Sequence, residues 1–193
     1  MRYIILTKKQ VSVFVCSFLV VALSIMGTLS VFASNNRKLP IYCVETDKKQ
    51  VAISFDAAWG ADDTEQLISI LKDFNVKATF FVVGAWVDKY PHAVEMLHNG
   101  GHSIQNHSNT HANMTQLTNA KMAEELSVCN EKISSITGKT PLLFRPPYGD
   151  YNNNVIDITY AQKLYPIQWD VDSSQFFGTP HKHWGCRHDL VEI

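Results

Sequence analysis

The chain has 193 residues, a length that favours a single domain. Hydrophobic residues make up 46% and charged residues 18%, a composition that excludes a disordered chain. The net charge is -1, from 17 Lys and Arg against 18 Asp and Glu, so no basic excess is available to bind phosphates and nucleic acid is not an expected partner. The four cysteines are too few and too scattered for a disulfide scaffold.

The first distinct segment is apolar. Residues 11–33 carry no charged side chain and are long enough to span a bilayer as a transmembrane helix, since about 20 residues suffice. Residues 1–10 contain basic but no acidic side chains, which keeps an N-terminus in the cytoplasm. A cleaved signal peptide is the alternative, but the length of the apolar run favours a membrane anchor. Both interpretations place the rest of the chain outside the cytoplasm, after a polar linker over 34–47.

The remainder of the chain alternates predicted strands with predicted helices. Short apolar and β-branched runs predict strands over 51–55, 78–83, 103–106, 142–144 and 167–169. Apolar residues at helical spacing predict helices over 64–74, 87–99, 118–137 and 152–164. This alternation predicts an α/β fold with a parallel sheet, either open or closed into a barrel.

Polar side chains follow four of the predicted strands. Asp56 follows the first, His107 and His111 follow the third, Arg145 follows the fourth and Asp172 follows the fifth. The carboxyl ends of parallel strands are where such folds carry their chemistry. Two histidines at this spacing can share one face of a helical turn, an arrangement that zinc commonly uses. A lone Asp after a strand is more often a turn or cap residue, so the prediction of a site depends on the whole set.

Four motifs in this order resemble those of the NodB-homology polysaccharide deacetylases, carbohydrate esterase family 4. The resemblance is strongest to the sporulation-associated PdaB-type members and extends to about Ser173. It implies a distorted (β/α) barrel that removes N-acetyl groups, with a bound metal, from peptidoglycan or a related glycan. The motifs are Ser-Phe-Asp-Ala-Ala-Trp-Gly at 54–60, His-Ser-Asn-Thr-His at 107–111, Arg-Pro-Pro-Tyr-Gly at 145–149 and Trp-Asp-Val-Asp-Ser at 169–173.

The resemblance implies three catalytic positions. Asp56 matches the general base that takes a proton from the attacking water. Arg145 would pair with Asp56 and fix its rotamer. The backbone N–H of Tyr148 would help to stabilise the tetrahedral oxyanion.

The resemblance also implies a metal and a glycan subsite. His107 and His111 would hold a divalent metal, expected to be zinc, which polarises the acetamide carbonyl and acidifies a bound water. Asp62, with Asp63 as the alternative, would be the third ligand. Substrate contacts are expected from Trp59, Pro147 and Asp172; Trp169 is expected to pack in the core more than on a sugar.

Two departures from the family pattern favour an impaired enzyme. Ala57 stands where the family has a second Asp, the metal ligand. Residues 175–193 show neither strand nor helix periodicity and match no acid-bearing C-terminal segment, although they contain three histidines and a cysteine. The sequence therefore predicts an incomplete deacetylase domain over 48–174, with its C-terminal strands missing, behind one transmembrane helix. A glycan-binding pseudoenzyme or a truncated fragment is the alternative.

Overall fold

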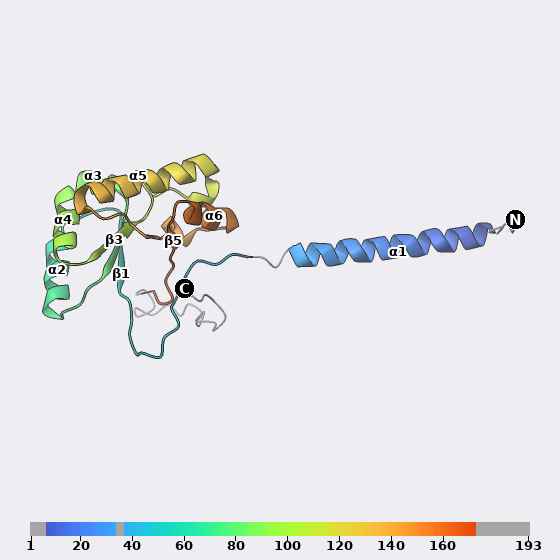
Figure 1. Ribbon diagram of the computed structural model, residues 1–193, viewed down its shortest axis with the longest axis horizontal. Helices are drawn as coiled ribbons and strands as arrows, with labels where there is room; N and C mark the ends of the chain where they lie inside the picture. The colour runs from blue at the N-terminus through green and yellow to red at the C-terminus, as the bar shows by residue number, and fades with distance from the viewer. Residues whose placement is uncertain (1–6, 34–36, 173–193) are drawn as a thin grey trace. The chain divides into compact units, whose positions relative to one another are not determined.

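The structure is a computed structural model that describes residues 7–33 and 37–172 (Figure 1). The chain divides into two compact units after Lys38. In the first unit, helix α1 spans Lys8–Ala33, as the apolar run predicts. Across 7–33 and 37–172, however, no helix combines the length and the hydropathy needed to cross a membrane. The structure therefore gives no support to the predicted membrane anchor.

The second unit contains one parallel sheet. Among the described residues its strands follow the order β1-β2-β3-β4-β5, with every neighbouring pair parallel. This order confirms the predicted parallel α/β architecture, and it is the order in which a βα barrel is wound. The strands are β1 (Ser54–Ala57), β2 (Thr79–Val82), β3 (Ser103–Asn106), β4 (Leu143–Phe144) and β5 (Tyr165–Pro166).

Helices connect the strands, and Figure 1 shows them covering one side of the sheet. Helices α4 and α5 both contact β3. The α-helices are α2 (Thr64–Asp73), α3 (Gly84–Lys89), α4 (Pro91–Asn99), α5 (Asn119–Thr137) and α6 (Asn153–Ala161). Two 3₁₀ turns, η1 (Met114–Gln116) and η2 (Pro147–Gly149), lie in the loops after β3 and β4.

Local capping interactions determine where helices α5 and α6 begin and where α5 ends. Thr118 caps α5 by accepting a hydrogen bond from the backbone N–H of Lys121, and Gly138 ends the helix at φ 67°. A left-handed residue at this point favours glycine, which has no Cβ to clash. Asn152 caps α6 in the same way, accepting from the N–H of Val155 at 2.9 Å. Both helices therefore begin where the sequence predicts.

The predicted helix over 87–99 is wrong as a single element. The structure has α3 and α4 separated at Tyr90, whose φ of -130° and ψ of 53° are not helical. Pro91 is the first residue of α4. A proline disfavours the helical conformation of the residue before it but is tolerated in the first turn, so it ends one helix and begins the next.

Two strands are displaced from their predicted positions. The first strand begins at Ser54 and not at Val51. Val51 is 88% exposed and does not enter the sheet. Asp56 consequently lies within β1 and not after it. The fifth strand is Tyr165–Pro166, two residues before the predicted one. Ile167 instead makes an isolated parallel bridge with Ile41, in the segment predicted as linker.

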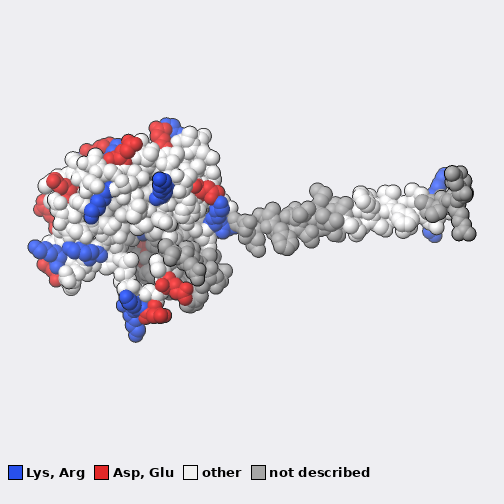
Figure 2. Space-filling model, viewed as in Figure 1, with Lys and Arg blue, Asp and Glu red and all other residues white. Residues whose placement is uncertain are grey.

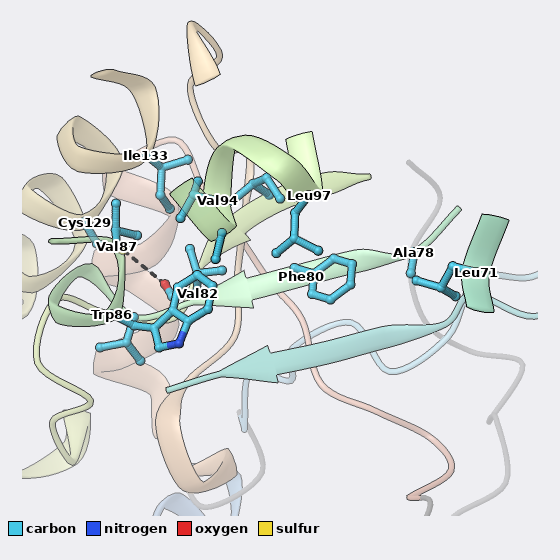
Figure 3. Packing of buried hydrophobic residues seen from close by; sticks show 13 residues of the cluster. Leu71, Ala78, Phe80, Val82, Trp86, Val87, Val94, Leu97, Cys129 and Ile133 are labelled. Atoms are coloured by element: carbon cyan, nitrogen blue, oxygen red, sulfur yellow. Dashed lines mark hydrogen bonds between the residues drawn. The ribbon is translucent and has the colours of Figure 1, made fainter. Parts of the chain in front are cut away.

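The main hydrophobic core fills the space between the sheet and its helices (Figure 3). Phe80 and Val82 project from β2 toward Val94 and Leu97 of α4. Cys129 of α5 is fully buried there and donates a hydrogen bond from its thiol to the backbone oxygen of Val82. Burial raises the pKa of this thiol to about 12, so Cys129 is a packing residue and not a nucleophile. This packing fixes the strands whose ends carry the polar motifs.

Candidate active site

The centre of the candidate site is an ion pair between Asp56 of β1 and Arg145, the residue after β4. Arg145 Nη1 donates to Asp56 Oδ1 at 2.7 Å, and its Nη2 donates to the Ser54 hydroxyl at 2.8 Å. The guanidinium is 5% exposed and lies 4.1 Å from the centre of the Phe81 ring. Asp56 keeps about a third of its side chain exposed. The arginine is therefore rigidly held, while the carboxylate it orients can reach a solvent molecule.

His107 lies beside this ion pair. Its Nε2 is 3.8 Å from Asp56 Oδ2, and its Nδ1 is 2.7 Å from the backbone oxygen of Arg145. A carbonyl oxygen only accepts, so Nδ1 carries the proton and donates it, and Nε2 keeps its lone pair. A backbone carbonyl that orients one ring nitrogen in this way is the usual support of a metal-ligating histidine.

His111 completes the pair of imidazoles. Its ring centre lies 5.0 Å from that of His107, with the two planes 70° apart. The Nδ1 atom of His111 is buried and has no hydrogen-bond partner among the described residues. An imidazole nitrogen left without a partner in this position is suited to a ligand that supplies the missing interaction.

Aromatic residues surround His111. The ring of Tyr148 lies 4.6 Å away and that of Trp59 lies 5.8 Å away, measured between ring centres. Both side chains are mostly exposed. The structure thus places both residues beside His111. Their roles toward the oxyanion and the sugar stay predictions.

Trp169 departs from its expected place in the core. It is 37% exposed and lies 5.7 Å from the Arg145 guanidinium. Its ring is so close to Gly149 that a Cβ there would come within 2.9 Å of it, and Gly149 also has φ 64°. The Arg-Pro-Pro-Tyr-Gly loop therefore needs glycine at this point to let the tryptophan cover Arg145.

The remaining predicted residues lie further from the centre. Asp62 is exposed in the turn before α2. Within 7–33 and 37–172, no three His, Cys, Asp or Glu side chains form a group that could hold a metal, so the structure does not bring Asp62 to the imidazoles. Pro147 is buried in η2, and Asp172 is half-buried at the end of the described chain. The three histidines and the cysteine of residues 175–193 lie outside the described residues.

The two imidazoles fit a metal in their chemistry, although they supply only two ligands. Burial lowers the pKa of His107, an effect that the nearby Asp56 carboxylate opposes. Burial also lowers the pKa of His111, again against the influence of Asp56. Both rings are therefore neutral at pH 7, the form that binds a divalent cation.

These lowered pKa values predict a pH dependence of stability. A histidine whose pKa is lower in the folded protein than the ordinary 6.5 takes up its proton more readily when unfolded, so acid favours unfolding. We expect the free energy of unfolding to decrease as the pH falls below about 6.5, measured in urea without metal. His107→Gln should reduce this dependence. The exposed His92, replaced by Ala, is the matched control and should leave it intact. An unchanged dependence in H107Q would exclude His107 as its source.

Comparison with known sequences identifies the family. The profile described as polysaccharide deacetylase matches residues 44–166, more than half of the chain. The chain belongs to the polysaccharide deacetylase family. The match spans β1 to β5 and so includes Asp56, both histidines and Arg145. This confirms the family resemblance predicted from the four motifs.

Relatives of this deacetylase-family chain include enzymes and an inactive protein. A peptidoglycan-N-acetylglucosamine deacetylase of Bacillus cereus is 32% identical over 132 residues, which are 68% of this chain and 48% of the relative. A solved CE4 family pseudoenzyme from Bacillus anthracis is 32% identical with a TM-score of 0.68, covering 72% of this chain and 50% of that one. A mutant of that pseudoenzyme with restored enzymatic activity is 33% identical, with a TM-score of 0.69 over 72% of this chain and 51% of that one. The chain spans about half the length of the curated relatives it matches.

Proposed function

We propose that this domain hydrolyses the N-acetyl groups of a polysaccharide, with an N-acetylated cell-wall glycan as substrate and a divalent metal, zinc, as cofactor. The observation that carries the proposal is the Asp56–Arg145 ion pair placed 3.8 Å from an imidazole nitrogen that keeps its lone pair. A base, a fixed cation and two neutral imidazoles, gathered from β1 and from the loops after β3 and β4 of one sheet, are the parts that amide hydrolysis requires.

The side chains have separate tasks in this reaction. Asp56, oriented by Arg145, takes the proton of the water that attacks the acetamide carbonyl. The burial of Arg145 and its bond to Ser54 keep the carboxylate in one rotamer. Trp59 and Tyr148 offer exposed ring faces beside His111, on which a sugar ring can stack.

His107 and His111 are the residues that would hold the metal. When bound, the metal supplies Lewis-acid polarisation of the carbonyl and a more acidic water. Two protein ligands make a weak site, since catalytic zinc usually has three. We therefore expect metal to be lost from the chain on dialysis more easily than from a three-ligand site.

An extracytoplasmic location is part of the proposal. The proposed substrate, a cell-wall glycan, lies outside the cytoplasm. The acidic and basic side chains are interspersed on the face shown in Figure 2, so this face offers no single-sign surface for a polyanion. A sporulation-linked role, inferred from the PdaB-type resemblance, belongs to the same proposal.

A glycan-binding pseudoenzyme is the second candidate. It is favoured by Ala57, which removes a carboxylate from the metal motif, and by the 32% identity to a solved pseudoenzyme of the family. In that case the aromatic rings around His111 would still bind sugar while hydrolysis is lost.

One experiment separates the two candidates. The purified full chain is incubated with an N-acetylglucosamine oligomer and Zn²⁺, and acetate release is measured together with glycan binding. Zinc-dependent acetate release is expected and supports the deacetylase. Binding of the oligomer without acetate release would support the pseudoenzyme. A glucosamine oligomer, which has no acetyl group, controls for acetate carried in with the reagents.

A further inference from the structure

The loop that joins the two imidazoles is held by a carboxylate from a distant helix. Glu125 lies on α5, and one of its oxygens accepts hydrogen bonds from the backbone N–H groups of Asn109 and Thr110, at 2.9 and 2.8 Å. Its other oxygen accepts from the Thr110 hydroxyl at 2.8 Å. Hydrogen bonds to an ionised acceptor are stronger than neutral ones, so this side chain is a strong support of the backbone at Asn109 and Thr110. Asn109 has two further contacts: its backbone oxygen accepts from the Ala85 N–H at 2.8 Å, and its side-chain oxygen accepts from Lys132 at 2.7 Å.

The start of the same loop is fixed separately. Asn106 is fully buried and donates from its side-chain nitrogen to the backbone oxygen of Leu126, at 2.8 Å, and to the side chain of Asn130, at 2.7 Å. Its oxygen accepts from the N–H of Ser108 at 2.8 Å. His107 is held by β2, since its N–H donates to Val82. The position of His107 therefore does not depend on Glu125.

The loop has a backbone conformation that needs such support. Ser108 has φ 66° and His111 has φ 60°, both left-handed conformations in residues other than glycine. Such conformations are strained in residues other than glycine and persist only where surrounding contacts impose them. Between these two residues, Glu125 makes three of the contacts that bind the loop to α5.

We propose that Glu125 is a positioning residue that sets the place of His111 relative to His107, and with it the metal affinity of the pair. The inference rests on the proposed metal site. Glu125 touches neither imidazole in this scheme and acts through the backbone of Asn109 and Thr110. Because His107 is anchored independently, loss of Glu125 should release the His111 end of the loop alone.

The test compares three variants of the full chain. Glu125→Ala should weaken Zn²⁺ binding by about 10- to 100-fold, the usual effect of removing a group that orients a ligand. Glu125→Gln should restore most of the affinity, because its amide oxygen can accept both N–H groups and its nitrogen can donate to Thr110. Glu124→Ala is the matched control, since the neighbouring Glu124 is exposed and pairs with Lys121. Titration calorimetry with ZnCl₂ gives the affinities.

Amide hydrogen exchange of the metal-free chain provides the second measurement. Exchange at residues 108–111 should be faster in E125A than in wild type and E124A, while exchange at β3 stays unchanged. Thr110 is exposed, and Thr110→Val removes only the hydrogen bond from its hydroxyl to Glu125. This variant should increase exchange at the same residues, but less than E125A does. Equal Zn²⁺ affinity in E125A and wild type, or unchanged exchange at 108–111, would overturn the proposal. A wild-type chain that binds no Zn²⁺ would instead contradict the metal site, and the exchange data would still decide whether Glu125 holds the loop.

Discussion

Asp56→Asn is expected to lower acetate release by roughly 10²–10⁴-fold, the range in which a general base contributes. The amide oxygen of Asn can still accept the hydrogen bond from Arg145, so the arginine keeps a partner. The amide cannot, however, take a proton from the attacking water. The rate of acetate release at saturating oligomer measures the effect.

The matched control is Asp73→Asn, an exposed carboxylate at the end of α2 that lies outside the site. It should leave the rate unchanged. Because Asp56 pairs with a buried arginine, urea unfolding of both variants must accompany the rates, so that lost activity is not confused with lost folding. An Asp56→Asn chain that stays folded, binds zinc and turns over at the wild-type rate would exclude Asp56 as the base.

Replacing both His107 and His111 with Ala is expected to abolish stoichiometric zinc binding. The two imidazoles are the protein ligands of the proposed site, and neutral imidazole is the form that coordinates the cation. Among the described residues, no group of three or more His, Cys, Asp or Glu side chains could hold a metal, so no other cluster there can compensate for their loss. Metal content after equilibration with Zn²⁺ and gel filtration gives the result.

Because His107 is buried, its loss can also destabilise the fold. His111→Ala alone addresses this point, since His111 is only half-buried, and it should reduce zinc binding while the chain stays folded. His92→Ala on α4 controls for the removal of an exposed imidazole. Unchanged metal content in the double variant would show that the metal, if any, binds elsewhere.

The sequence predicts those parts of the fold that depend on local signals. Helix α5 starts and stops as expected because Thr118 and Gly138 act within one turn of its ends. Pro91 separates α3 from α4, which is also a local effect. The sequence does not reveal this break, because apolar residues at helical spacing continue on both sides of Pro91. At β1, apolar side chains at Val51 and Ile53 suggest a buried strand, whereas the structure leaves both exposed.

The sequence indicates which residues form the candidate site, but not which residues hold them in position. The order of the motifs places Asp56, His107 and Arg145 at the carboxyl ends of strands of one parallel sheet, and the structure brings them together. Glu125 gives no signal in the sequence, because an acidic residue on a helix resembles any solvated one. Its role appears only when α5 packs against the loop, which brings Glu125 to residues 15 and 16 positions earlier in the chain, a contact that depends on tertiary structure.

The bridge between Ile41 and Ile167 has a consequence for how the chain folds and for how one edge of its sheet is protected. The Ile41 N–H donates to Pro166 and its oxygen accepts from Gln168, both at 2.8 Å, so a segment that precedes the first strand covers the free edge of the last one. An uncovered strand edge is a template for pairing between molecules, and this short segment occupies it with the chain's own backbone. Contacts between residues so far apart in sequence form late, because the intervening loop must first be ordered. We therefore expect a chain shortened to begin after Ile41 to fold its sheet but to expose the unpaired backbone groups of this edge to other molecules.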